Sequence, residues 1–351
     1  MKRVVIGMSG GVDSSVAAAY LKEQGYEVIG LTMKLWEGDA SCSSPSKDAE
    51  NVAKKLGIEF HILDFQKEFS QFVIDYFVNE YINGRTPNPC IACNKFLKFD
   101  AMAKAANDLG ADYLATGHYA KIKFDEKAGR YLLLKADADS KDQTYVLYNL
   151  SQDILSKLLL PLGDFTDKSA VREYAEKHNL LVANKPDSQE ICFIPDNDYV
   201  SFIKERIGYI PKEGNFVDLN GNVLGRHKGI VNYTIGQRKG LGIAFGKPMF
   251  VNRIDAENNH IILGEQGTEF SYTLYAINEN FIAFEAINQP IKAFAKVRYS
   301  AKPAACIIYP EDSRLKVVFD TPQRAITPGQ AVVFYDGDIV LGGATIIQAG
   351  V

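Results

Sequence analysis

A glycine-rich loop between a short apolar run and a helical pattern constrains this chain most. Arg3–Gly7 has the pattern of a buried strand, and Met8-Ser9-Gly10-Gly11-Val12-Asp13-Ser14-Ser15 follows it directly. From Asp13 to Gln24 the apolar residues recur at helical spacing. Two adjacent glycines let backbone N–H groups turn inward, and the start of a helix adds partial positive charge. The segment predicts an anion site at the carboxyl end of a first parallel strand.

The side chains of this loop favour a phosphate ligand. Ser9 and Ser14 carry hydroxyl donors, and Asp13 is a candidate ligand for Mg²⁺. The loop lacks both the Gly-Lys-Ser/Thr of a Walker motif and the G-x-G-x-x-G of a dinucleotide fold. SGGVDS resembles the pyrophosphate loop of ATP pyrophosphatases, enzymes that adenylate a substrate oxygen and release pyrophosphate. A tight turn with a serine cap is the structural alternative.

The rest of the chain divides into an α/β part and a β-rich part. The first part alternates expected strands (Glu27–Met33, Glu59–Leu63, Tyr113–Thr116) with expected helices (Asp48–Leu56, Phe69–Tyr81, Lys95–Leu109). This alternation predicts a doubly wound parallel sheet. After about Pro195, short β-type runs are separated by turn signals such as Asn220-Gly221 and Asp336-Gly337. We therefore expect an α/β ATP-binding domain over residues 1–196, a small β-rich middle domain over 197–266 and a C-terminal β-barrel over 267–351.

The distribution of charge suggests a polyanionic partner although the net charge is −4. Residues 219–254 contain no Asp or Glu but six Lys or Arg, and residues 287–310 contain none beside Lys292, Lys296, Arg298 and Lys302. Such segregation can build a local positive surface for nucleic acid. Ordinary solvated strand faces are the alternative for either stretch alone.

Five cysteines in 351 residues are an odd number for a secreted disulfide framework. The first apolar run is too short for a signal peptide, and no stretch approaches the roughly 18 apolar residues of a membrane helix. We expect a cytoplasmic protein with no membrane partner.

Three cysteines stand in polar surroundings that suggest chemistry. Cys90 and Cys93 follow two prolines in a rigid loop that feeds a helix, where the helix start and Lys95 would stabilise a thiolate on Cys93. Cys192 lies in the polar segment Asp187–Ile194 at an expected strand entry, and a small buried hydrophobe is its alternative. Cys306 is expected in the core, and Cys42 in an exposed loop.

Six segments in order resemble the tRNA-specific 2-thiouridylase family over most of the chain: GMSGGVDSS, TPNPxxxCNKxxKF, ATGHYA, KDQTYVL, SQEICFI and TIGQRKGLG. The resemblance implies ATP-dependent 2-thiolation of the wobble uridine in tRNAs of the Lys, Glu and Gln types. The C2 oxygen would be adenylated, and sulfur would come from a persulfide supplied by a sulfur-carrier protein. The barrel would grip the anticodon arm.

The same resemblance implies a role for individual residues. Cys93 would be the nucleophile, Cys192 would carry the persulfide, and the two would close a disulfide after transfer. Asn88, Pro89 and Cys90 would contact the target base. ATP would contact Gly7, Met8, Ser9, Gly10, Gly11, Val12, Asp13, Ser14, Met33 and Gly117, with Gly117 letting adenine approach. The tRNA would contact His118, Lys141, Asp142, Gln143, Arg298, Tyr299 and Gln330.

Cys90 departs from the family pattern, because much of the family has at this position an Asp that is a proposed general base. Members with a cysteine there look able to hold an iron–sulfur cluster, here on Cys90, Cys93 and Cys192. Thiolation through such a cluster is therefore an alternative route. Competing functions are those of an amide-forming ligase with the same pyrophosphate loop and of a tRNA-binding protein without catalysis.

Overall fold

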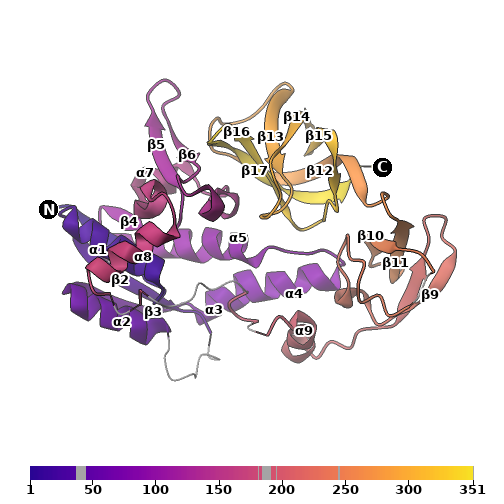
Figure 1. Ribbon diagram of the computed structural model, residues 1–351, viewed down its shortest axis with the longest axis horizontal. Helices are drawn as coiled ribbons and strands as arrows, with labels where there is room; N and C mark the ends of the chain where they lie inside the picture. The colour runs from indigo at the N-terminus through magenta and orange to yellow at the C-terminus, as the bar shows by residue number, and fades with distance from the viewer. Residues whose placement is uncertain (37–44, 181, 184–190, 195, 244–245, 351) are drawn as a thin grey trace.

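The computed structural model describes residues 1–36, 45–180, 182–183, 191–194, 196–243 and 246–350. Its strands form three sheets. In Figure 1 a parallel sheet lies at the left, a small sheet lies at the right, and a barrel lies above the helices that connect them. Within these residues, no helix combines the length and the apolar character needed to cross a membrane.

The N-terminal sheet consists of parallel strands in the order β3-β2-β1-β4-β7. The strands are β1 (Arg3–Gly7), β2 (Glu27–Lys34), β3 (Glu59–Asp64), β4 (Tyr113–Ala115) and β7 (Leu158–Leu159). The chain moves outward from β1 to β3 and then returns to β4 on the other side of β1. The loop after β1 thus lies at the switch point of the topology, where open parallel sheets bind their ligands.

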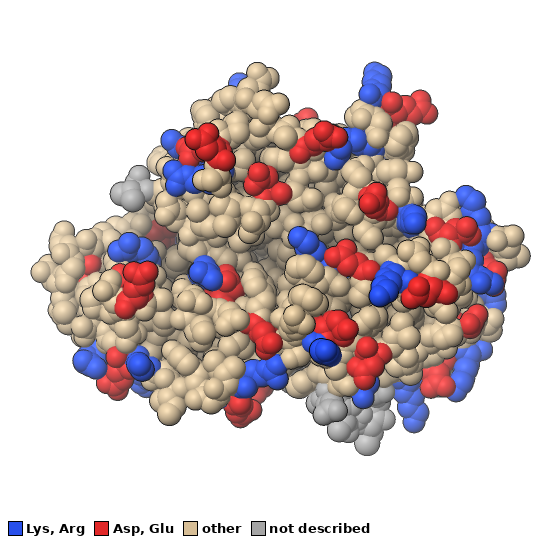
Figure 2. Space-filling model, turned by 180° about the vertical axis from the view of Figure 1, so that it is seen from behind, with Lys and Arg blue, Asp and Glu red and all other residues tan. Residues whose placement is uncertain are grey.

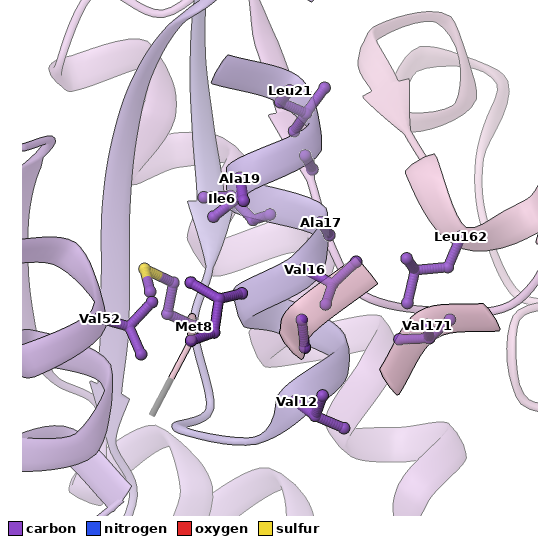
Figure 3. Packing of buried hydrophobic residues seen from close by; sticks show 14 of the residues in the cluster. Ile6, Met8, Val12, Val16, Ala17, Ala19, Leu21, Val52, Leu162 and Val171 are labelled. Carbon is purple, nitrogen blue, oxygen red and sulfur yellow. The ribbon is translucent and has the colours of Figure 1, made fainter. Parts of the chain in front are cut away.

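Helices cover both faces of this sheet, as expected for a doubly wound fold. Val4 and Ile6 of β1 face one way and pack against α1 (Val12–Glu23), α2 (Pro45–Leu56) and α8 (Lys168–Lys177). Figure 3 shows Ile6 and Met8 in this cluster with Val12 and Val16 of α1. Val5 faces the opposite way, toward α6 (Met102–Asp108). Neighbouring residues of a strand point to opposite faces, so a continuous apolar run suits a strand covered on both sides.

Two long helical segments contain π-helical turns. The first joins α3 (Gln66–Phe69) to α4 (Asp75–Ile82) through the π segment Ser70–Ile74. The second joins α5 (Pro89–Cys93) to α6 through the π segment Asn94–Ala101. The predicted helices are present, but helical periodicity alone could not show the π turns, which are frequent at functional sites.

The C-terminal strands close into an antiparallel barrel, because β12 pairs with both β15 and β17. In sheet order its strands are β12 (Phe270–Phe281), β15 (Arg314–Arg324), β14 (Ala304–Glu311), β13 (Ile291–Lys296), β16 (Ala331–Asp336) and β17 (Ile339–Ala349). The hairpin of β5 (Lys121–Asp125) and β6 (Arg130–Leu134) extends this sheet from β17. A segment from the first 196 residues is therefore built into the barrel's sheet.

The small sheet has the order β10-β11-β8-β9 and follows α9 (Tyr199–Ile207). Its strands are β8 (Gly214–Val217), β9 (Val223–His227), β10 (Met249–Asp255) and β11 (His260–Glu265). The remaining helical elements are α7 (Gln152–Lys157) and the 3₁₀ turns Asp139–Lys141, Thr144–Val146, Pro161–Asp164 and Ile230–Asn232.

The barrel is fixed against the parallel sheet by an apolar cluster that both share. Val333 and Tyr335 of β16 lie in the same buried cluster as Val5 of β1 and as Tyr145. At the edge of this interface, Gln330 Nε2 donates to the carbonyl oxygens of Thr86 (2.8 Å) and Pro87 (3.2 Å). The Thr86 N–H donates to the Pro328 carbonyl at 2.9 Å. The barrel therefore holds the loop that leads into α5.

Removing the Gln330 amide should loosen this loop without unfolding the barrel. In Gln330→Ala, two carbonyl groups lose their donor, which costs about 1–3 kcal/mol of local stability. We expect amide hydrogen exchange at Thr86 and Cys90 to become about 5- to 100-fold faster. Gln323→Ala is the matched control, because its amide donates only within β15, to Thr321. Equal exchange in both variants would contradict the docking role.

Candidate functional site

The loop after β1 leaves a helix start open to a ligand. Gly10 has a φ of +71°, and the Ser9 N–H donates to Ser14 Oγ at 3.1 Å. Gly11 is the N-cap of α1 and offers no side chain to the first-turn N–H groups. Uncapped N–H groups at a helix start are a ready site for an anion.

Asp13, in the first turn of α1, is held by two groups that its motif did not indicate. Lys168 Nζ lies 2.8 Å from both Asp13 carboxylate oxygens, and the Tyr119 hydroxyl donates to Oδ1 at 2.6 Å. Lys168 is the first residue of α8, whose N-cap is Asp167. The Asp167 side chain was a sequence signal for a helix start, but nothing local to Lys168 indicated its distant partner.

Gly117 follows β4 and packs against the start of α1. A Cβ atom there would lie 2.8 Å from the Ser14 nitrogen and 2.9 Å from the Asp13 carbonyl carbon. The glycine is required by this close approach of the backbone, whereas the sequence had suggested an approach of adenine. Contact with ATP stays a prediction for both Gly117 and Met33.

His118 is a buried and neutral imidazole. Its Nδ1 lies 2.8 Å from the Thr116 hydroxyl, and burial lowers the pKa of the ring to about 3, with a smaller contribution from Lys98. A neutral ring cannot attract an RNA phosphate by charge at neutral pH. The predicted tRNA contact of His118 would have to be a hydrogen bond or a stacking contact.

The short helix α5 presents two of the three candidate cysteines. Asn88 caps it by accepting the Cys90 N–H at 3.1 Å, and Pro89 occupies the first helical position. Cys90 is exposed and Cys93 is buried, and both are free thiols, as is Cys192.

Charge on nearby groups adds to burial in setting the pKa values of Cys93 and Cys192. Burial raises the pKa of Cys93, Lys98 lowers it and Cys90 raises it. Although Cys192 is exposed on one side, desolvation raises its pKa to about 11, with further contributions from Cys93 and Cys90. Cys90 and Cys93, three residues apart on α5, therefore lie near enough to Cys192 to affect its pKa, which places the three thiols in one region of the structure.

The expected stabilisation of a Cys93 thiolate by Lys95 is wrong. Cys93 ends α5 rather than starting a helix, and its burial outweighs the nearby positive charge. The Lys95 ammonium instead lies 5.4 Å from the centroid of the Phe96 ring. The cation that acts on Cys93 is Lys98, the second lysine of TPNPxxxCNKxxKF, which also acts on Cys192 and His118.

Cys192 lies in a turn ahead of α9, so the expected strand entry is wrong for the part of the segment that is described. Residues 187–190 and Cys42 lie outside the described residues. Cys306 is buried in β14, which confirms its place in the core. Among the described residues, no three His, Cys, Asp or Glu side chains form a group that could hold a metal. The iron–sulfur alternative on Cys90, Cys93 and Cys192 is therefore not supported.

Several predicted tRNA contacts lie between the thiols and the Asp13 loop. The Tyr299 hydroxyl donates to the Asp142 carbonyl at 3.2 Å, and Cys90 is close enough to raise the pKa of Tyr299, which burial raises most. Gln143 Oε1 accepts the Tyr119 N–H at 2.9 Å. Lys141 and Arg298 are half-buried. Gln330 instead contacts the loop that contains Thr86 and Pro87. Their contact with tRNA stays a prediction.

Two basic residues of the first acid-free stretch are paired with acids outside it. Arg226 pairs with Glu213 at 3.5 Å, and Lys247 pairs with Glu265. Lys296 lies 5.5 Å from the centroid of the Tyr299 ring. On the face shown in Figure 2, Lys and Arg residues are interspersed with Asp and Glu residues.

Comparison with known proteins covers nearly the whole chain. Residues 2–196 match the family described as tRNA methyl transferase HUP domain, residues 200–265 its PRC-barrel domain, and residues 271–346 an aminomethyltransferase β-barrel domain. The chain is 56% identical to the tRNA-specific 2-thiouridylase MnmA of Acetivibrio thermocellus, over 98% of this chain and 99% of that protein. It is 56% identical to the MnmA of Clostridioides difficile, over 98% of each chain. With the MnmA of Carboxydothermus hydrogenoformans it shares 54% identity over 98% of this chain and 97% of that protein. This chain belongs to the tRNA-specific 2-thiouridylase family.

Proposed function

We propose that this protein replaces the C2 oxygen of the wobble uridine in tRNA with sulfur, using ATP to activate the oxygen. The observation that carries the proposal is a group of three free thiols, two of them on α5 and the third, Cys192, near enough for both to affect its pKa. Lys98 links these thiols to His118, and the next residue, Tyr119, binds Asp13 in the phosphate loop. The reaction of an amide-forming ligase does not require these thiols. A tRNA-binding protein without catalysis does not require a helix start that can bind phosphate.

ATP binding is supported by the loop after β1 and by the groups around Asp13. The uncapped start of α1 and the ammonium of Lys168 would receive the leaving pyrophosphate. Asp13 fits a site for Mg²⁺, since proteins bind Mg²⁺–phosphate through one or two carboxylates. When bound, Mg²⁺ would neutralise charge on the pyrophosphate, while Lys168 and Tyr119 hold the carboxylate in place.

The thiol pKa values give a reason for delivering sulfur as a persulfide. Cys93 and Cys192 are both protonated at neutral pH, and a protonated thiol is a poor nucleophile. A persulfide on Cys192 is more acidic and stays nucleophilic. Its terminal sulfur attacks C2 and displaces AMP, which gives a C2–S–S–Cys192 bond. Cys93 then attacks Cys192 Sγ and passes its proton to the leaving base, so that the 2-thiouridine departs protonated at N3 and a Cys93–Cys192 disulfide forms.

The electrons of this sequence balance within the site. The transferred sulfur is reduced by two electrons as the two cysteines are oxidised to the disulfide, and thiols of the cell reduce that disulfide again. Exposure of Cys192 on one side supports its loading by a separate sulfur-carrier protein. Exposure of Cys90 beside Tyr299 supports a contact between Cys90 and the target base. The cytoplasmic location stays a prediction.

Loss of either sulfur-handling cysteine should abolish thiolation. Cys93→Ser and Cys192→Ser should give no 2-thiouridine when tRNA, ATP and a persulfide source are incubated and the nucleosides are measured by mass spectrometry. Serine can neither carry a persulfide nor form the disulfide. Cys306→Ser is the control, because Cys306 lies in the barrel core. Full thiolation without Cys93 and Cys192 would contradict this sulfur route. No thiolation by the wild type, with pyrophosphate release that survives both substitutions, would favour the amide-forming ligase.

Lys168 should matter for the adenylation step rather than for sulfur transfer. Lys168→Met removes the cation beside Asp13, and we expect tRNA-dependent pyrophosphate release to fall by about 10²–10³-fold. Lys177→Met, an exposed lysine at the other end of α8, should leave the rate unchanged. Similar rates in the two variants would mean that Lys168 serves only to fix α8.

The reactivity of Cys192 should rise steeply with pH. Since its pKa is raised to about 11, the thiolate fraction at pH 8 is small and increases about tenfold per pH unit up to pH 10. We expect the iodoacetamide alkylation rate, followed on the Cys192 peptide, to keep increasing through pH 10. A cysteine-containing model peptide should reach half its maximal rate near pH 8.5 and level off at about pH 9.5. Levelling of Cys192 in that same range would contradict the desolvated environment.

A further inference from the structure

A cavity lies on the side of α5 that faces away from Cys90 and Cys93. Its volume is about 590 Å³, and its walls come from the π segment Ser70–Ile74, α4, α5, β12 and the loop before β16. A cavity of this size holds a small planar molecule or one nucleotide unit. No residue used in the proposed chemistry lines it except Asn88, the cap of α5.

The cavity is rich in amides and nearly neutral in charge. Five asparagines line it: Asn79, Asn88, Asn149, Asn278 and Asn280. Of its acids, Asp75 is paired with Arg206 at 3.0 Å, and Glu279 is exposed on β12. Lys95 is its one lining lysine among the described residues. Two of the asparagines are partly used within the protein, since Asn280 Nδ2 donates to the Tyr148 and Leu150 carbonyls and Asn88 Oδ1 accepts the Cys90 N–H. The wall still offers amide donors and acceptors but little charge for a phosphate.

Two exposed phenyl rings form the aromatic part of the wall. Phe72 and Phe96 are 37% and 38% exposed, and their rings stack with centroids 5.1 Å apart and an interplanar angle of 25°. Both residues lie on π-helical segments, and Lys95 lies over the Phe96 ring. Exposed aromatic rings next to amides are the surface on which proteins stack and read unpaired bases.

The position of the cavity relates it to the thiolation site. At helical spacing, Asn88, Ala92 and Lys95 share one side of the α5 segment, whereas Cys90 and Cys93 lie on the other. The two sides of a helix are about 10 Å apart including side chains, a distance that neighbouring nucleotides of an extended loop can span. A wobble base at Cys93 would therefore place an adjacent base within reach of the phenyl rings.

We infer that this cavity binds an unpaired base of the anticodon loop next to the wobble uridine, by stacking on Phe72 and Phe96 and by hydrogen bonds to the asparagine amides. The inference rests on the proposed function, which supplies the tRNA substrate. This site would recognise a base by stacking and hydrogen bonds rather than by charge. It is separate from the residues expected to contact the RNA backbone.

The test uses the full-length protein and measures binding of tRNA at several salt concentrations. Phe96→Ala should weaken binding about 5- to 100-fold, the usual loss for one base–aromatic stack, and the slope of log K against log salt should stay at the wild-type value. Arg298→Glu should instead reduce that slope. Phe124→Ala is the matched control, since Phe124 is an exposed phenylalanine on β5 outside the cavity. Phe72→Ala should give the same result as Phe96→Ala, which would show that the loss does not come from a folding defect of the Phe96 variant alone.

Anticodon stem–loops with single abasic nucleotides identify the base. One abasic position beside the wobble uridine should weaken binding to the wild type by the same factor as Phe96→Ala, and should weaken binding to Phe96→Ala no further. Unchanged binding by both phenylalanine variants, or losses that add at every abasic position, would overturn the inference. A raised KM for ATP with unchanged tRNA binding would overturn it in favour of a free nucleotide. Failure of the wild type to thiolate intact tRNA, measured in parallel, would instead overturn the proposed function.

Discussion

The packing of the barrel against the parallel sheet is the constraint on which the site depends. Val5 on the sheet and Val333 and Tyr335 on the barrel share one dry cluster, so the two parts cannot shift independently without exposing buried apolar surface. At its edge the barrel holds the Thr86–Pro87 backbone, and the next residues cap and begin α5. The barrel, on which we expect tRNA to bind, is thereby joined through neighbouring residues of the chain to the helix that contains Cys90 and Cys93. Any RNA contact that shifts the barrel would reach Cys93 through this short path.

Much of the fold could be predicted from local sequence, because buried parallel strands and glycine-rich turns have strong local patterns. β1 has the predicted bounds, and the loop after it lies at the expected switch point. The hairpin β5–β6 could not be assigned to the barrel, since its pairing with β17 joins segments about 200 residues apart, and no local pattern encodes such a pairing. The bounds of β12 could not be predicted either, because most of its residues are half-buried or exposed and polar and aromatic residues are mixed along it.

The candidate site shows the same division between local and distant information. The three cysteines and Asp13 could be chosen from their motifs. Lys168 is 155 residues from Asp13 and could not be found by spacing, although it is the cation that meets the carboxylate. The expectation for Cys93 was wrong because a helix start and a nearby lysine suggest a low pKa only where the thiol remains hydrated. Burial depends on the tertiary structure, and here it outweighs the charge of Lys98.

Burial of Cys93 also bears on how α5 can serve the proposed sulfur transfer on one side and the proposed base recognition on the other. A desolvated thiol is protected from oxidants and alkylating agents until a partner raises its reactivity, so the chain keeps Cys93 inert between turnovers. The opposite side of α5 remains wet, amide-lined and aromatic, which suits reversible recognition rather than bond formation. The π turns at Asn94–Ala101 and Ser70–Ile74 make this possible by widening the helices where Phe96 and Phe72 emerge. The two rings, one from each π segment, stack with their centroids 5.1 Å apart and so form a single aromatic surface on the wall of the cavity.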